Sequence, residues 1–302
     1  MQRSVVRAMP WVFVLIWSTG FVVARLGMPH APPFSFLTVR FALSAVCFFV
    51  WIGLAHAAWP VGRMQWGHLA ITGVLMQAGY LGGVWSAVKA GIGAGTVALL
   101  VGLQPVLTAL WVTATASRAG RSEPSRSVGV SARQWLGLLL GLAGLVLVVW
   151  PKMGTGEVTP VNLAMALVAL LGITIGTLYQ KRYVAPCDVR TASAIQMLAA
   201  LVISAPFALL EPEVMDWHVN LVAAMAWSVG VLTLGGSSLL YLLIQRGEAT
   251  TVTSLLYLVP PCTAAMAWLL FAEAFTPVMM VGMALTVVGV AIVVRRRGAA
   301  SA

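Results

Sequence analysis

The sequence predicts an all-helical membrane protein with ten transmembrane helices, arranged as two inverted repeats of five helices. Three observations lead to this prediction. Of the 302 residues, 60% are hydrophobic and only 9% are charged, whereas charged residues make up about a quarter of a soluble domain. Apolar runs of about 20 residues, long enough to cross a bilayer, recur along almost the whole chain. The second half also repeats the pattern of glycines, prolines and leucines seen in the first half.

Each predicted helix is a long apolar run that ends at glycine, proline or charged residues. The second helix follows the proline pair Pro32 and Pro33, and the fifth follows the basic segment RAGRSEPSRSVGVSAR. The helices of the first half are predicted at residues 9–27, 34–54, 67–87, 93–115 and 134–151. Those of the second half are predicted at residues 160–180, 190–210, 222–244, 250–271 and 276–294.

The basic residues predict how the chain is oriented. Most of the 18 lysines and arginines fall in the loops that share a side with the two termini, whereas Arg25, Lys89 and Lys152 fall on the other side. Because cytoplasmic loops are enriched in lysine and arginine, both termini are predicted to be cytoplasmic. The net charge of +10 is therefore a property of loops between spans, and we expect no nucleic-acid partner.

An internal repeat relates the two halves of the chain. A shift of 156 residues places Gly20 on Gly176, Gly79 on Gly235, Gly91 on Gly247 and Pro105 on Pro261. A shift of 145 residues places Gly137 on Gly282 and Gly144 on Gly289 in the last helix of each half. We therefore divide the chain into repeats at residues 1–151 and 152–302. The start of the chain resembles a signal peptide, but its counterpart in the second repeat indicates that it is retained.

The odd number of helices in each repeat indicates how the two repeats are oriented, and this orientation indicates a function for the protein. With five helices per repeat, the second copy must enter the membrane in the opposite orientation to the first. Inverted repeats give many secondary transporters two access states, with a solute site near the midplane between the repeats. The alternative is that the duplicated sequence builds a symmetric bundle or channel without such an alternation.

Several segments resemble one transporter family. The runs IWSTGFVVARLG, FSFLTVRFALSA and VKAGIGAGTVALLVGLQPVLTALW, together with the stretch from IQRGEATT to VVGVAIV in the second half, are similar to the EamA-type branch of the drug/metabolite transporter superfamily. The resemblance covers nearly the whole chain. It implies ten helices in two inverted halves and export of small metabolites, such as amino acids, across the bacterial inner membrane. It also implies that Glu273 is the glutamate often found between the last two helices of a half; the first half has the basic loop instead.

Arg40 is the first candidate for solute binding. It lies about six residues into the second predicted helix, where an unpaired charge costs roughly 2.5 to 3.5 kcal/mol. It must therefore face protein or water, and it could bind a substrate carboxylate through charge-assisted hydrogen bonds. A structural arginine satisfied by backbone carbonyls explains it equally well. Its counterpart in the second repeat is Gln196.

A polar and aromatic stripe is the second candidate feature. Gln77 and Tyr80 share one face of the third predicted helix, and Ser237 and Tyr241 in the eighth match Leu81 and Trp85 under the repeat. Such a stripe would suit a cavity for an amphipathic or aromatic solute. The alternative is hydrogen bonding between helices and aromatic packing at the membrane interface. The remaining candidates for the solute site are Trp17, Trp85, Gln104 and Tyr257.

Prolines predict bending in both halves. Pro105, Pro260 and Pro261 fall within predicted helices at matching positions, where the missing amide breaks the hydrogen-bond ladder. Kinks of this kind would suit a gate, although a static kink that accommodates neighbouring helices is an equal alternative.

Few acidic residues are placed where they could couple transport to an ion or catalyse a reaction. The eight acidic residues all lie in loops or at helix ends, so that only Glu248 and Glu273 are candidates for ion coupling. The chain has only four histidines, its three cysteines lack C-x-x-C spacing, and it contains no phosphate-binding loop. We therefore expect no catalytic residue, no metal, no cofactor and no enzyme activity.

The function expected from the sequence is therefore secondary transport, with export of small amphipathic metabolites by alternating access. The alternative is a structural or partner-binding helical bundle without transport activity; a membrane enzyme is the weakest interpretation. The expected partners are a small-molecule metabolite and the lipid bilayer. The motif Gly137-x-x-x-Gly141 would suit close packing either within the chain or in a homodimer.

Overall fold

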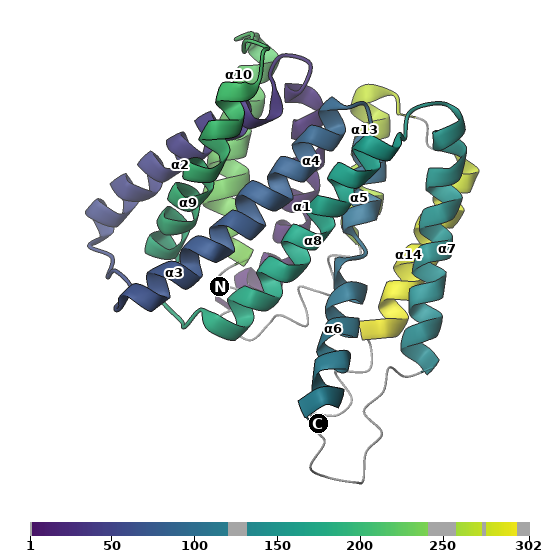
Figure 1. Cartoon of the computed structure of the whole chain (residues 1–302), viewed down its shortest axis with the longest axis horizontal. Helices are drawn as coiled ribbons and strands as arrows, with labels where there is room; N and C mark the ends of the chain where they lie inside the picture. The colour runs from purple at the N-terminus through teal and green to yellow at the C-terminus, as the bar shows by residue number, and fades with distance from the viewer. Residues whose placement is uncertain (1, 120–131, 241–257, 274–275, 295–302) are drawn as a thin grey trace.

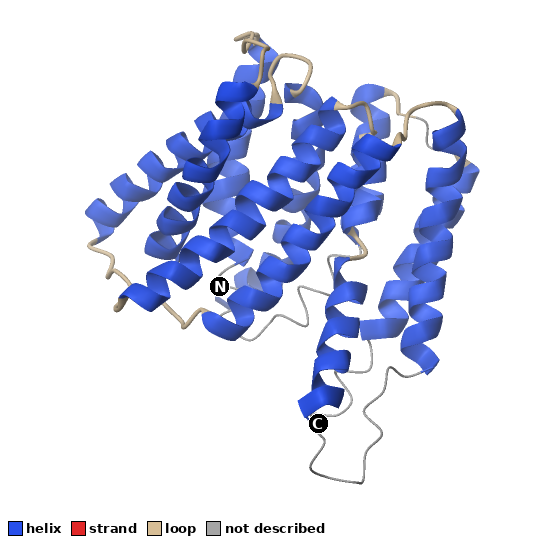
Figure 2. Ribbon diagram, viewed as in Figure 1, coloured by secondary structure: helices blue, strands red, loops and turns tan. Residues whose placement is uncertain are grey.

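A computed structural model describes residues 2–119, 132–240, 258–273 and 276–294 of the chain. Within these ranges every regular element is helical and there is no strand (Figure 2). The first half contains α1 (Gln2–Gly27), α2 (Pro33–Ala55), α3 (Arg63–Gly73), η1 (Val74–Gly79), α4 (Tyr80–Lys89), α5 (Ala94–Val101), α6 (Gln104–Ala119) and α7 (Ala132–Gly154). The second half contains α8 (Pro160–Tyr183), α9 (Val189–Leu210), α10 (Val219–Trp227), η2 (Ser228–Ser237), α13 (Val259–Phe271) and α14 (Pro277–Val294).

The helices are long and apolar, as the sequence predicts. Six of them are long and apolar enough to cross a membrane, and three further apolar helices are shorter within the described residues. The elements α3, η1 and α4 follow one another without a gap and together cover the third predicted helix. The described elements are therefore consistent with ten membrane-crossing segments in the predicted order.

Two π-helical segments lie at matching positions of the repeat. η1 ends at Gly79 and η2 includes Gly235, the residue that matches it. In η2 the Thr233 hydroxyl donates to the carbonyl of Ser228, five residues earlier, at 2.9 Å. π-Helical segments are rare and are often found at functional sites. The widened turns therefore mark the same place in both halves.

Matching helices of the two halves also pack against each other. α2 packs against its match α9, and α7 packs against its match α14; Figure 1 shows the second pair side by side at one edge of the molecule. This pairing is what two repeats related by a twofold axis would produce. The opposite orientation of the repeats in the membrane stays a prediction.

Glycines allow α7 and α14 to pack closely. A side chain at Gly289 would place its Cβ 2.5 Å from the Gly137 carbonyl oxygen and 2.7 Å from the Gly141 nitrogen. Gly144 faces Gly282 in the same interface. The motif Gly137-x-x-x-Gly141 therefore packs inside the chain, as small residues do between membrane helices, which is the first of its two predicted uses; it gives no support to the second, a homodimer.

Acidic side chains hold loops together at one end of the bundle. The Glu211 carboxylate accepts hydrogen bonds from the backbone N–H groups of Phe34 and Ser35 at 2.8 and 2.7 Å, at the start of α2. Lys89, at the end of α4, donates to Glu213 at 2.5 Å and to the Met28 carbonyl at 3.1 Å. We call this end of the molecule the Glu211 end.

The opposite end is named the Asp188 end. Asp188 caps α9 by accepting a hydrogen bond from the backbone N–H of Arg190 at 2.9 Å. The Arg190 guanidinium also donates to this carboxylate and holds the pKa of Asp188 below its usual value. Gln65 bridges to the next loop by donating to the Ala185 carbonyl at 2.8 Å. Charged groups thus gather at the two ends, with the apolar core between them.

The three prolines predicted to bend helices lie at helix starts in the described residues. The fourth predicted helix is interrupted at Gly102 and Leu103, and Pro105 lies in the first turn of α6. Proline suits this position because the first N–H groups of a helix have no intrahelical partner. The expected kink is therefore an interruption just before the proline. Pro260 and Pro261 lie in the first turn of described helix α13, and residues 241–257 before them lie outside the described ranges.

Candidate functional site: a central cavity

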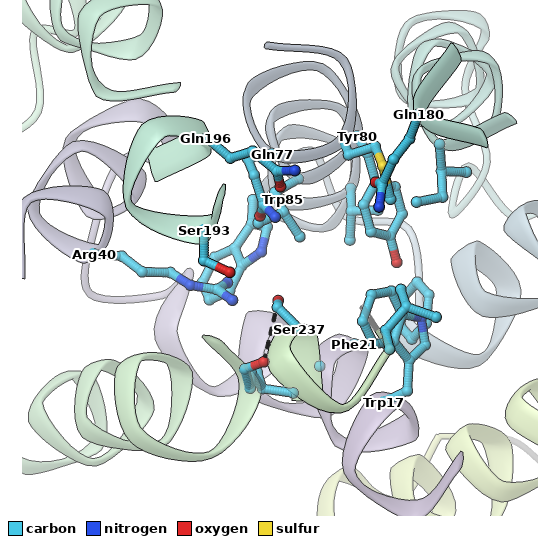
Figure 3. A pocket seen from close by; sticks show the side chains of 17 residues that line it. Trp17, Phe21, Arg40, Gln77, Tyr80, Trp85, Gln180, Ser193, Gln196 and Ser237 are labelled. Atoms are coloured by element: carbon cyan, nitrogen blue, oxygen red, sulfur yellow. Dashed lines mark hydrogen bonds between the residues drawn. The ribbon is translucent and has the colours of Figure 1, made fainter. Parts of the chain in front are cut away.

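A cavity lies between the two halves of the chain. Its volume, measured as the space that the centre of a water molecule can occupy, is about 60 Å³. That space would hold about four to six waters. Helices α1, α2 and α4 and the segment η1 of the first half line it together with α8, α9 and η2 of the second half. Its polar and aromatic lining residues are Trp17, Phe21, Arg40, Gln77, Tyr80, Trp85, Gln180, Ser193, Gln196 and Ser237 (Figure 3).

Residues at matching positions of the repeat line this cavity in pairs. Arg40 and Gln196 both border it, and so do Leu81 and Ser237. Three more pairs under the same shift of 156 residues are Trp17 with Ile173, Met76 with Leu232, and Val84 with Leu240. The cavity is thus formed by the same structural positions taken once from each half.

Arg40 is the charged residue of the cavity. Its side chain is 4% exposed, and it donates to the Thr233 hydroxyl from Nε at 3.3 Å and from Nη2 at 3.2 Å. Its Cζ lies 5.9 Å from the centroid of the Trp85 ring, within the range of a cation–π interaction. None of the ion pairs found among the described residues includes Arg40.

Amide side chains from both halves meet beside Arg40. Figure 3 shows Gln77 of η1 and Gln196 of α9 next to each other at the cavity edge. Gly73 allows this approach, because a Cβ there would lie 2.6 Å from the Gln196 Cα. Ser193, one turn before Gln196, faces the same space as the Arg40 guanidinium. This side of the cavity therefore carries hydrogen-bond donors and acceptors beside a positive charge.

Aromatic side chains form the other wall. The rings of Trp17 and Tyr80 are nearly parallel, with centroids 6.4 Å apart and an interplanar angle of 4°. Phe13 packs against Trp17 with ring centroids 5.1 Å apart, and Phe36 stacks on Trp85 at 4.3 Å. Packed aromatic rings have few accessible rotamers, so this wall is rigid.

The structure places most of the predicted site residues around this cavity. Trp17, Arg40, Gln77, Tyr80, Trp85 and Ser237 all line it. Gln104 does not border it and instead donates to the Thr177 hydroxyl at 3.2 Å. Tyr241, Tyr257 and Glu248 lie outside the described residues.

The sequence-based prediction missed four polar or aromatic lining residues: Phe21, Gln180, Ser193 and Gln196. The signal for Gln196 was present, because it matches Arg40 under the repeat. Ser193 could have been found from Gln196, since it lies one helical turn earlier. Nothing in the sequence distinguishes Gln180 from a polar residue at a helix end.

Glu273 lies at the Glu211 end and does not border the cavity. Its carboxylate accepts from the backbone N–H groups of Ala94 at 3.1 Å and Gly95 at 3.5 Å, at the start of α5. Arg25 Nε lies 3.9 Å from the same carboxylate. A negative charge at a helix N-terminus stabilises the helix. The geometry of Glu273 is thus that of a helix cap contributed by a neighbouring segment.

The sequence of this chain is similar to those of known membrane transporters. A sequence model of the EamA-like transporter family matches residues 9–116 and 161–295. The inner membrane transporter YedA of Escherichia coli K12, whose name describes it as uncharacterized, is 26% identical over 226 residues, which cover 74% of this chain and 67% of that protein. A "probable amino-acid metabolite efflux pump" of Salmonella typhimurium is 23% identical, over 91% of this chain and 90% of that protein.

A solved structure shares the fold. One crystal structure aligns with a TM-score of 0.64 and 22% sequence identity, covering 94% of this chain and 95% of that chain. At 22% sequence identity, this structural similarity indicates a shared fold and nothing about function. An "uncharacterized transporter" of Archaeoglobus fulgidus is 23% identical over 92% of this chain and 93% of that protein.

Proposed function

The chain belongs to the EamA-like transporter family, and from this premise we propose that it is a secondary transporter of small amphipathic metabolites, such as amino acids. In this proposal it exports them across the inner membrane by alternating access. The names of the relatives support transport at the inner membrane, and one of them names an efflux pump for amino-acid metabolites.

One observation carries the proposal: the cavity is lined by matching residues of the two halves, and these include Arg40 and its counterpart Gln196. A solute held at such a site contacts equivalent positions of both repeats. If the repeats are inverted, exchanging their conformations would open the same site to the other side of the membrane. The two access states would then have similar energies.

The contacts at the Glu211 end suit a closed state on that side. Lys89 joins the end of α4 to Glu213 and to the Met28 carbonyl, and the His30 imidazole lies 3.3 Å from the Asp216 carboxylate. We propose that this end faces away from the cytoplasm, because the basic loops lie at the other end. Opening toward that side would require these contacts to separate.

Protection of a cysteine in the cavity tests the proposal. The test uses Ser237→Cys in a chain whose Cys47, Cys187 and Cys262 are replaced by serine. We expect a panel of amino acids and organic acids to contain a solute that slows the reaction of this cysteine with N-ethylmaleimide. Thr155→Cys, in an exposed turn away from the cavity, is the matched control and should react at the same rate with every solute. Equal rates at Ser237→Cys with and without every solute would favour the structural bundle instead.

A further inference from the structure

We propose that the cavity selects a solute with a net negative charge, an organic monocarboxylate with an apolar or aromatic body, over a zwitterionic amino acid. The inference rests on the proposed function, because it takes the central cavity as the solute site. It narrows the amphipathic metabolites of that proposal to one charge class. Three features of the cavity, taken over the part of the chain that the structure describes, carry it: an arginine without a carboxylate partner, a lining without acidic residues, and an aromatic wall.

The first feature is the incomplete hydrogen bonding of Arg40. Of the described residues, only Thr233 accepts from its guanidinium, with one hydroxyl oxygen serving both Nε and Nη2. A guanidinium carries more N–H groups than this one oxygen can accept, and it prefers a planar carboxylate that accepts two of them in parallel. The side chain is 4% exposed, so bulk water does not satisfy the remaining groups. A carboxylate entering the cavity would supply both the charge and the acceptors that are missing.

The second feature is the absence of an opposite charge in the lining. Among the described residues that border the cavity there is no aspartate or glutamate, and Arg40 is the charged one. The ammonium group of an amino acid would find the oxygens of Gln77, Gln196 and Ser193, but it would also stand near a positive guanidinium. Like charges in a poorly solvated site repel more strongly than in water. A solute with a carboxylate and no ammonium group avoids this repulsion.

The third feature is the shape of the remaining space. Trp17 and Tyr80 present an aromatic wall across the cavity from the Arg40 side (Figure 3). Trp85 lies between the two regions, under the guanidinium and stacked on Phe36. A solute with its carboxylate on Arg40 would direct its body toward Trp17 and Tyr80. An aromatic or branched body placed there would bury apolar surface against these rings.

Three closely matched probes separate charge from shape: 3-phenylpropionate, its neutral amide 3-phenylpropanamide, and L-phenylalanine. Binding to the purified full chain in lipid nanodiscs would be measured by calorimetry at pH 7. The expected result is that 3-phenylpropionate binds at least about tenfold more tightly than either of the others, a difference of about 1.4 kcal/mol. Similar affinity for the acid and the amide would overturn the proposal, and so would tighter binding of L-phenylalanine.

Two variants assign the preference to Arg40. Arg40→Gln, which copies the second half, should bind the acid and the amide with similar affinity. Arg40→Lys keeps the charge without the planar donors, and it should retain part of the preference for the acid. Size-exclusion chromatography and thermal unfolding of each variant would report whether it is folded. A preference for the acid that survives unchanged in Arg40→Gln would place the anion site elsewhere and overturn the proposal.

Failure of this inference is distinguishable from failure of transport. If none of the probes binds while the protein in liposomes transports another solute, the monocarboxylate assignment is wrong and the transporter remains. If no probe binds and no solute is transported, the proposed function fails together with the inference.

Discussion

The Arg40 guanidinium donates to the Thr233 hydroxyl from two nitrogens, at 3.3 and 3.2 Å, and thereby joins α2 of the first half to η2 of the second. Thr233 is held in place by its own hydrogen bond to the Ser228 carbonyl inside the π-helical segment. The contact lies at the edge of the cavity that both halves share. It connects the one charge of that cavity, among the described residues, to the local widening of the helix in η2.

Replacing Thr233 by valine tests this contact. Thr233→Val keeps the size of the side chain and removes the oxygen that Arg40 uses. The buried guanidinium then loses its acceptor, so we expect the free energy of unfolding to fall by about 1 to 2 kcal/mol. Thermal unfolding of the purified protein in detergent would measure the change.

Thr174→Val is the matched control for that variant. Thr174 is also a buried threonine in a helix, but its hydroxyl donates to the Leu170 carbonyl of its own helix at 2.6 Å and serves no charged group. We expect Thr174→Val to shift the melting temperature less than Thr233→Val. Equal shifts would show that Arg40 does not depend on Thr233.

The interface between α7 and α14 should tolerate no side chain at Gly289. Gly289→Ala places a methyl group against the backbone of Gly137 and Gly141, and overpacking of this kind destabilises by about 1 to 3 kcal/mol. Gly53→Ala is the control, because nothing lies within 4 Å of a Cβ at that position. The Gly53 variant should melt within a few degrees of the unchanged protein. If both variants melt alike, the close approach of α7 and α14 is wrong.

The geometry of Glu273 predicts a structural role instead of ion coupling. Glu273→Gln weakens the interaction of a carboxylate with the start of α5, and we expect a loss of about 0.5 to 2 kcal/mol in stability. Glu211→Gln, which weakens the equivalent contact at α2, should cause a loss of similar size. Neither variant should change how transport responds to a pH gradient. Loss of gradient dependence in Glu273→Gln alone would make Glu273 a coupling residue.

The contacts of Lys89 predict which end of the cavity is closed. Lys89→Gln removes the ion pair with Glu213, so the protein should open more often at the Glu211 end. We expect a membrane-impermeant maleimide added on that side to label Ser237→Cys several times faster in the Lys89→Gln background. Arg63→Gln, at the opposite end, is the control, because Arg63 forms none of the ion pairs found among the described residues. No acceleration by Lys89→Gln would show that these contacts do not gate the cavity.

Hydropathy predicted the helices well, because a membrane span needs a long apolar run whatever its neighbours are. The repeat predicted more than local pattern could, since it pairs positions far apart in the sequence. Arg40 and Gln196 are matched in this way, and both border the cavity. Trp17 was predicted for the cavity because a polar tip within a span needs a partner, and Ser237 because it matches Leu81 under the repeat.

Other features depend on contacts that the sequence does not display. A π-helical turn such as η1 differs from an α-helix by one hydrogen-bond register, and no residue type requires it. Glu273 belongs to a loop near the end of the chain, and only the folded protein brings it to the N–H groups of Ala94 and Gly95. Gln104 lies deep in a predicted span as the cavity residues do, yet its partner is Thr177.

The most direct test of the account is transport by the purified protein in liposomes. The liposomes would be loaded with a labelled mixture of amino acids and aromatic monocarboxylates, and release would be followed with and without a pH gradient. The account predicts protein-dependent release of at least one component, accelerated by the same solute outside and slowed in Arg40→Gln. Release equal to that from protein-free liposomes for every component would contradict it.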